Sequence, residues 1–333
     1  MKMDHTTLKI PAFLRKAFPD SCQEAEEVLQ ATGYELLIPD HFLRQIKACG
    51  EKGLFRQVWP HSGELAESPY FTTDPLQEQA PATRKNGTVH LLQKYSGRAL
   101  LLTTSQCFGN CRFCFRRHLR KEELFHPDEN AFSQEIQQMA TDSSLHEIIL
   151  SGGDPMTLTD TVLESLLRRL AEIPHLRRIR FHTRVVSFCP ERVSEKLLKI
   201  LQKSPQTLSF VLHINHPAEL SQESRQAIAK LHQNGILLLQ QAVLLRGIND
   251  SVDVLATLYE KLADENVVPY YLHQLDRVAG ATHFEVPVEE GGKLLTELRK
   301  RLPGYAVPRY VREIPGEMSK LPVPSPPYNP GEK

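Results

Sequence analysis

The strongest constraint on the fold is a series of short apolar segments, rich in β-branched residues, that recur along the second part of the chain. After the first interval their starts are about thirty residues apart, and amphipathic stretches typical of helices lie between them. This alternation predicts parallel βαβ units. Six units indicate an incomplete barrel, with a doubly wound open sheet as the alternative. The expected strands are Ala99–Thr104, Glu147–Leu150, Arg178–His182, Leu208–Ile214, Ile236–Leu244 and Val267–Leu272. The expected helices are Thr161–Glu172, Ser194–Gln202, Ser221–Asn234, Ser251–Glu265 and Glu289–Arg301.

The flanking segments differ in character from this repeating part. Residues 1–90 predict an extension with two helices between Asp20 and Gly50, broken near Thr32-Gly33, and then an irregular connection that wraps on the barrel. Residues 91–320 are expected to form the barrel, with Val307–Ile314 as a further strand. Residues 321–333 are rich in proline, which predicts an extended or disordered tail.

The composition of the chain argues against several classes of function. The chain has 333 residues with 40 basic and 40 acidic side chains, and this neutral balance argues against bulk nucleic-acid binding. The sequence has no apolar run of the roughly 18 residues that a membrane span needs. The N-terminal stretch lacks the apolar centre of a secretion signal, so we expect a cytoplasmic protein.

Three of the six cysteines, Cys107, Cys111 and Cys114, fall within eight residues directly after the first predicted barrel strand. In a reducing compartment such a cluster is typical of metal binding. Three thiolates on one loop suit an iron–sulfur cluster with one iron left open. The alternative is a structural zinc ion, which would need a fourth protein ligand, and His118 is the nearest candidate. In that case the chain would be a zinc-stabilised scaffold that binds a protein partner of translation.

A second motif, Ser151-Gly152-Gly153-Asp154, follows the second strand. Paired glycines allow a backbone edge to approach a ligand closely. Together the two motifs resemble the radical S-adenosylmethionine (SAM) superfamily. The resemblance implies a [4Fe–4S] cluster on the three cysteines, and SAM bound by residues 151–154 and by His213, Asn215 and Gln241.

Longer runs resemble the lysine 2,3-aminomutase family, from about Asp74 to Pro322. They are Cys114-Phe-Arg-Arg-His118, His213-Ile-Asn-His-Pro217, Gln240-Gln-Ala-Val-Leu-Leu-Arg-Gly-Ile-Asn-Asp250 and Pro269-Tyr-Tyr-Leu-His-Gln-Leu-Asp276. This resemblance implies a second cofactor, pyridoxal 5′-phosphate (PLP), on Lys320, with its phosphate held by Tyr95 and Arg98. It implies that Arg116 binds the α-carboxylate of lysine, and that Asp276 and Glu313 bind the distal amine. A radical SAM enzyme without PLP is the alternative that ignores Lys320.

Glu313 departs from the family, which has Asp at this position. Two other departures point to a subgroup: Pro315-Gly-Glu-Met-Ser319 replaces a glycine-rich run before Lys320, and the sequence stops about a dozen residues after Lys320. With the runs Cys107–His118 and Arg312–Lys320, these two departures resemble the enzymes that make (R)-β-lysine from (S)-α-lysine for the ligase that modifies translation elongation factor P. A free-standing catabolic or biosynthetic lysine 2,3-aminomutase is the alternative. The family implies a reduced flavodoxin or ferredoxin as electron donor, and either a monomer or a dimer fits.

Overall fold

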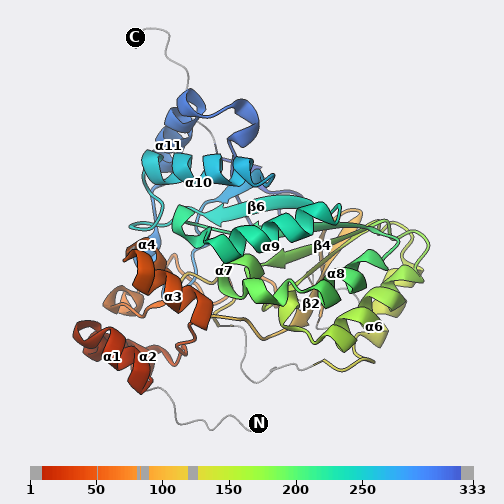
Figure 1. The fold of residues 1–333 in the computed structure, drawn as a ribbon, viewed down its shortest axis with the longest axis horizontal. Helices are drawn as coiled ribbons and strands as arrows, with labels where there is room; N and C mark the ends of the chain where they lie inside the picture. Colours follow the sequence, from red (N-terminus) through yellow and green to blue (C-terminus); the bar gives the residue numbers. More distant parts are fainter. Residues whose placement is uncertain (1–9, 51, 81–82, 84–89, 119–126, 324–333) are drawn as a thin grey trace.

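The computed structural model describes residues 10–50, 52–80, 83, 90–118 and 127–323. Within them, one sheet has nine strands in the same order as the sequence (Figure 1). Strands β2 to β8 are parallel, whereas β1 and β9 pair antiparallel at the two edges. The strands are β1 (Leu91–Tyr95), β2 (Arg98–Thr104), β3 (Glu147–Gly152), β4 (Arg178–Thr183), β5 (Thr207–His213), β6 (Leu237–Val243), β7 (Val268–His273), β8 (Arg309–Arg312) and β9 (Leu321–Pro322).

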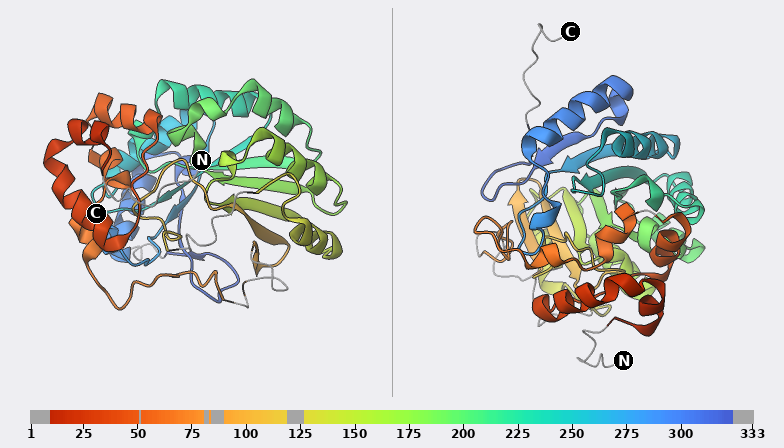
Figure 2. Two further views of the ribbon diagram at one scale, coloured as in Figure 1. Left: turned by 90° about the horizontal axis from the view of Figure 1, so that it is seen from below. Right: turned by 90° about the vertical axis from the view of Figure 1, so that its left-hand side faces the viewer.

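The barrel helices cover the outer, convex face of the sheet (Figure 2). They are α5 (Ser133–Thr141), α6 (Asp160–Ala171), α7 (Val185–Phe188), α8 (Glu195–Gln202), α9 (Gln222–Gln233), α10 (Val252–Asp264) and α11 (Val288–Arg301). A doubly wound sheet would reverse its strand order at a switch point. The order here proceeds in one direction, which confirms the partial barrel and excludes that alternative.

The two faces of the strands are packed differently. Ala99 and Leu101 of β2 are buried among apolar side chains of the outer helices, and they belong to the main hydrophobic core. The alternate residues of β2, β4 and β6 are only half-buried. In a filled barrel the inward side chains are tightly packed, so these half-buried positions indicate an open interior that can admit ligands.

The N-terminal extension lies at the end of the barrel where the parallel strands finish, as both figures show. Its helices are α1 (Ala12–Ala17), α2 (Cys22–Thr32), α3 (Asp40–Cys49) and α4 (Lys52–Val58). The predicted break is real, because Gly33 ends α2 in the left-handed conformation with φ 60°. Phe42 of α3 packs edge-on against Phe188 of α7, with ring centroids 4.8 Å apart, and so joins the extension to the barrel.

Three segments complete the architecture. The irregular connection contacts the barrel as expected, since Thr72 pairs with Val278, although residues 81–82 and 84–88 of it lie outside the described part. The expected strand near residues 307–314 is present as β8, and the first two tail residues form the edge strand β9; residues 324–333 are not among those described. The sequence interpretation did not include β1, which forms a hairpin with β2 through Ser96-Gly97.

Candidate active site

The three clustered cysteines lie on the loop after β2, half-buried beneath the N-terminal extension. Burial raises the pKa of Cys107 well above its usual range, and the nearby Cys114 and Asp154 charges raise it further. Burial and Cys111 raise the pKa of Cys114 to about 11. Thiols in this state form thiolates together only when a positive centre compensates them, so the chemistry of the donor set fits a metal cluster.

His118, the fourth ligand that zinc would need, has its Nε2 atom 2.8 Å from the carbonyl oxygen of Ala279. In the part of the chain that the structure describes, no three His, Cys, Asp or Glu side chains are arranged to hold a single metal ion.

A buried carboxylate from the extension holds the cysteine loop in shape. Glu64 accepts hydrogen bonds from Arg112 at 2.8 and 2.6 Å and from Arg117 at 2.6 Å. The side chains of Glu64 and Arg112 have no exposed surface. The Tyr34 ring lies close to both guanidinium groups, whose carbon atoms are 4.6 and 4.4 Å from its centroid, and its hydroxyl donates to the Cys111 carbonyl. The loop conformation therefore depends on residues about fifty to eighty positions away in sequence.

The paired glycines allow two backbone segments to meet. A Cβ atom at Gly152 would overlap the carbonyl oxygen of Thr104, and one at Gly153 would overlap that of Gln106. The amide of Gly153 donates to the Thr104 carbonyl at 2.6 Å. The glycines thus bring the end of β3 against the start of the cysteine loop, a protein contact that the sequence interpretation did not foresee.

Asp154 connects the ends of β3 and β4. Its carboxylate accepts from the Thr183 hydroxyl at 2.7 and 2.9 Å, the Arg184 amide at 2.8 Å and the Met156 amide at 3.0 Å. Burial raises its pKa in spite of these donors.

Arg184, directly after β4, reaches the cysteine loop. Its Nη1 atom donates to the Cys111 sulfur at 2.9 Å, and its Nη2 atom donates to Glu219 at 2.9 Å and to Gln57 of α4 at 2.8 Å. The sequence interpretation missed Arg184, Glu219 and Gln57, because no local motif marks partners so distant along the chain.

The three residues expected on the SAM side lie together at the ends of β5 and β6. His213 and Gln241 are register partners on the two strands. The His213 Nε2 atom lies 3.1 Å from Oδ1 of Asn215, and burial lowers the pKa of His213 to about 3. Asn215 is fully buried and donates to Gln57 at 3.0 Å. A neutral, buried group of this kind can hydrogen-bond a ligand without adding charge.

A second charged group lies where the two edges of the open sheet approach each other. Glu313, after β8, pairs with Lys320 and also with Lys94 of β1, the latter at 3.2 Å. Burial alone would raise the pKa of Glu313, but the two lysines lower it to about 2. Burial and the Glu313 charge raise the pKa of Asp276 to about 7.

Tyr95 and Arg98 face each other across the β1–β2 hairpin, with the Arg98 guanidinium 4.6 Å from the Tyr95 ring centroid. Burial and Glu313 raise the pKa of Tyr95, so its hydroxyl stays protonated. Among the described residues Arg98 forms no ion pair, which leaves its N–H groups available for an anion.

Arg116 joins the two charged regions. Its Nε and Nη2 atoms donate to both oxygens of Glu78, at 2.7 and 2.9 Å, and its Nη1 atom donates to the Ser151 hydroxyl at 3.0 Å. Burial alone would lower the pKa of Arg116, but Glu78 raises it, and the charges of Cys114 and Glu313 add to this effect. Arg116 therefore interacts electrostatically with both the cysteine loop and the group around Glu313. The sequence interpretation did not include Glu78 or Lys94.

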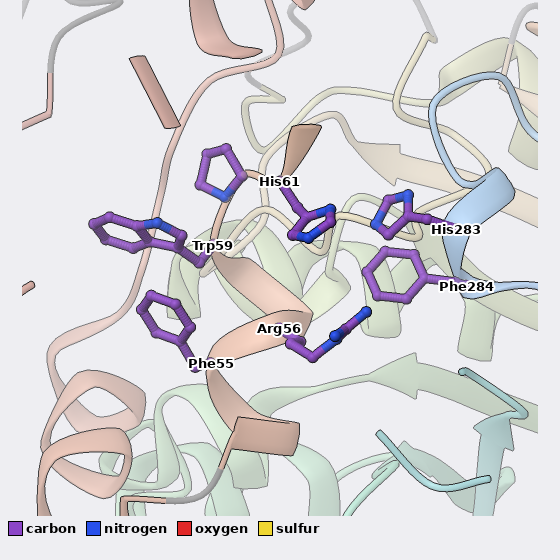
Figure 3. A pocket seen from close by; sticks show the side chains of 7 residues that line it. Phe55, Arg56, Trp59, His61, His283 and Phe284 are labelled. Atoms are coloured by element: carbon purple, nitrogen blue, oxygen red, sulfur yellow. The ribbon is translucent and has the colours of Figure 1, made fainter. Parts of the chain in front are cut away.

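Figure 3 shows a small hollow lined by Phe55, Arg56, Trp59, Pro60, His61, His283 and Phe284. None of the expected site residues lines it. The chemistry-bearing side chains therefore lie outside this hollow.

Comparisons with known proteins agree with this arrangement. The sequence model of the radical SAM superfamily matches residues 101–258. Proteins named L-lysine 2,3-aminomutase are similar over most of their length. The one from Escherichia coli (strain K12) is 41% identical over 87% of this chain and 83% of its own. The chain belongs to the L-lysine 2,3-aminomutase family of radical SAM enzymes. Its relatives from Buchnera aphidicola subsp. Baizongia pistaciae and Haemophilus influenzae are 39% and 37% identical, over 86% and 93% of this chain and 84% and 91% of theirs.

Members of this family are isomerases, and membership implies a [4Fe–4S] cluster and SAM. In the described residues, no helix is long and apolar enough to cross a membrane.

Proposed function

We propose that this protein is a radical SAM and PLP-dependent isomerase that converts (S)-α-lysine to (R)-β-lysine. The observation that carries the proposal is the placement of Arg116, which follows Cys114 by two residues and donates to the Ser151 hydroxyl at 3.0 Å and the Gly152 carbonyl at 3.1 Å, while the Glu313 charge of the acid–lysine group still acts on its pKa. A substrate bound between these regions would meet a guanidinium for its carboxylate and two acids for its distal amine.

The residues of the interior suit the two cofactors. Cys107, Cys111 and Cys114 would hold the cluster, and residues 151–154 with His213, Asn215 and Gln241 would surround SAM. Lys320 would carry PLP, with Tyr95 and Arg98 as donors to its phosphate. When bound, SAM supplies a radical after the cluster gives it an electron, and PLP holds the migrating amine.

The protein side chains select and orient the substrate. Glu78 accepts hydrogen bonds from the Nε and Nη2 atoms of Arg116. The carboxylate of an incoming substrate therefore either displaces Glu78 or binds the remaining N–H group of Arg116. Asp276 and Glu313 offer charges to the distal ammonium. Glu313 already faces two lysines, and once Lys320 carries PLP it retains Lys94 as its pair. Asp276 is then the stronger partner for the substrate amine.

The product is proposed to serve the ligase that modifies translation elongation factor P. The resemblance of the Cys107–His118 and Arg312–Lys320 runs to that subgroup supports this assignment. We further propose a cytoplasmic enzyme reduced by a flavodoxin or ferredoxin, divided into an extension (1–90), a barrel (91–320) and a tail (321–333). A free-standing lysine 2,3-aminomutase is distinguished by testing whether the product, with the ligase, modifies elongation factor P.

The deciding experiment is anaerobic. The protein is reconstituted with iron, sulfide and PLP, given (S)-α-lysine, SAM and dithionite, and assayed by mass spectrometry after chiral derivatisation. (R)-β-lysine supports the proposal, whereas 5′-deoxyadenosine without β-lysine would mean another substrate. Lys320→Ala is expected to lose the visible absorbance of lysine-bound PLP. Lys293→Ala, an exposed position on α11, is the matched control that keeps it.

A further inference from the structure

Arg184 is a charged side chain held against a sulfur atom of the proposed cluster. Its Nη1 atom donates to the Cys111 sulfur at 2.9 Å, and its side chain is only 8% exposed. An arginine is always protonated in a protein, so this contact is a charge-assisted hydrogen bond.

Aromatic rings lie around the guanidinium group of Arg184. The guanidinium carbon lies 4.1 Å from the ring centroid of Phe188, 5.8 Å from that of Phe42 and 5.9 Å from that of Phe113. These rings exclude water, and charges interact more strongly where water is excluded. The charge of Arg184 therefore acts on the cysteine loop with little screening.

One carboxylate balances this charge. Oε2 of Glu219 accepts from Arg184 at 2.9 Å. Oε1 accepts from the amide of Asn215 at 2.9 Å, the amide of His216 at 3.1 Å and the side chain of Gln57 at 3.0 Å. Glu219 is fixed by neutral donors on one side and meets Arg184 on the other, so the pair forms a dipole whose positive end points at the sulfur.

The other arginines of the loop are engaged elsewhere. Arg112 and Arg117 bind Glu64 and backbone carbonyls, and Arg116 binds Glu78, Ser151 and Gly152. Within the described part of the chain, Arg184 is the one arginine with a hydrogen bond to a cysteine sulfur of this loop.

We propose that Arg184 is a positioning residue that sets the reduction potential of the cluster, with Glu219 opposing it. The inference rests on the proposed function, since it requires a cluster on the three cysteines. One electron passes from the proposed reduced flavodoxin or ferredoxin to the cluster, which oxidises the donor, and no bond or proton at Arg184 changes. The hydrogen bond from Arg184 to the Cys111 sulfur stabilises the extra negative charge of the reduced cluster. This stabilisation raises the reduction potential of the cluster.

The test is a potentiometric titration of the reconstituted protein without SAM, followed by electron paramagnetic resonance. Arg184→Gln removes the charge and is expected to lower the equilibrium constant for reduction at least tenfold, which is 59 mV for one electron. Glu219→Gln keeps a similar shape and removes the opposing charge, so it is expected to raise the potential. Arg184→Lys retains the charge but not the reach to sulfur, so its potential should lie between those of Arg184→Gln and the wild type.

Shifts of opposite sign from two partners separate this role from general damage. Arg192→Gln is the matched control, because Arg192 pairs with Asp160 and binds the Met156 and Leu158 carbonyls without touching a sulfur. Its potential should equal that of the wild type. If Arg184→Gln does not fold, Arg184→Gln/Glu219→Gln leaves no unpaired charge, and its potential should be lower than that of Glu219→Gln.

Two results would overturn the proposal. One is an unchanged SAM-free potential in Arg184→Gln with full iron and sulfide content, accompanied by weaker SAM binding, which would make Arg184 a ligand for SAM. The other is a shift of the same sign in Arg184→Gln and Glu219→Gln. Failure of the wild-type protein to assemble a cluster on the three cysteines would instead refute the proposed function itself.

Discussion

Glu64 offers the sharpest test of how the N-terminal extension shapes the active site. Its carboxylate is the shared partner of Arg112 and Arg117, and the exposed fractions of the three side chains are 0%, 0% and 1%. Removing one partner of a buried ion pair costs roughly 3–5 kcal/mol, because a charge is left without compensation. Glu64→Ala leaves two such charges, so we expect at least the upper part of that range. A domain is stable by only about 5–15 kcal/mol, so the loss is a large share of the total.

Glu64→Gln separates charge from shape. The amide can still accept one hydrogen bond but not neutralise two arginines, and hydrogen bonds to charged groups contribute roughly 1.5–3 kcal/mol. We therefore expect the order wild type, Glu64→Gln, Glu64→Ala in the midpoint of urea unfolding, with iron content per chain falling in the same order. Glu285→Ala is the control, because its partner Arg277 is 53% exposed and such surface pairs contribute about 0–1 kcal/mol.

The ion pairs of Glu64 with Arg112 and Arg117 also make the stability of the protein depend on pH. Burial alone would raise the pKa of Glu64, but Arg112 and Arg117 lower it below the usual 4.5. A carboxyl with a lowered folded-state pKa stabilises the protein above 4.5 and loses this contribution as the pH falls further. Glu64→Gln should flatten that acid limb. A Glu64→Ala protein within about 1 kcal/mol of the wild type, with normal iron content, would refute the argument, because the two arginines would then have found other partners.

Three further outcomes are expected. Cys107→Ala, Cys111→Ala or Cys114→Ala should abolish reductive SAM cleavage, while the exposed Cys49→Ala should not; an active Cys111→Ala protein would exclude the cluster on this loop. Gly153→Ala places a Cβ on the Gln106 carbonyl and should cost roughly 3 kcal/mol and prevent cluster assembly, whereas Gly304→Ala, with open space around it, is the control for unfolding measurements. Asp276, whose pKa is raised to about 7, should bind the lysine amine better as it ionises, so the KM for lysine should fall between pH values of about 6 and about 8. Its raised pKa also means that stability decreases as the pH rises from 3.8 to about 7, and Asp276→Asn should remove both dependences.

The sequence predicts the parts of this molecule that local patterns determine. The six core strands follow from apolar runs at regular spacing, and the position of the cysteine loop follows from its place after the first of them. Strand β1 was missed because Leu91–Tyr95 is short, and its pairing with β2 depends on the turn at Ser96-Gly97. Glycines 152 and 153 could be recognised as a close approach, but only the structure shows that the neighbour is the backbone of Thr104 and Gln106.

The site is harder to predict because its arginines are positioned by residues far away in sequence. Gln57, Glu64 and Glu78 all precede residue 90, and they hold Arg184, the pair Arg112 and Arg117, and Arg116. Composition suggests a boundary at residue 90, yet the counter-charges and hydrogen-bond acceptors of the barrel site come from the segment before it. A buried arginine without its acceptor is costly. The extension should therefore be regarded as part of the active site's electrostatics, and a barrel without it would leave four arginines around the cysteine loop short of partners.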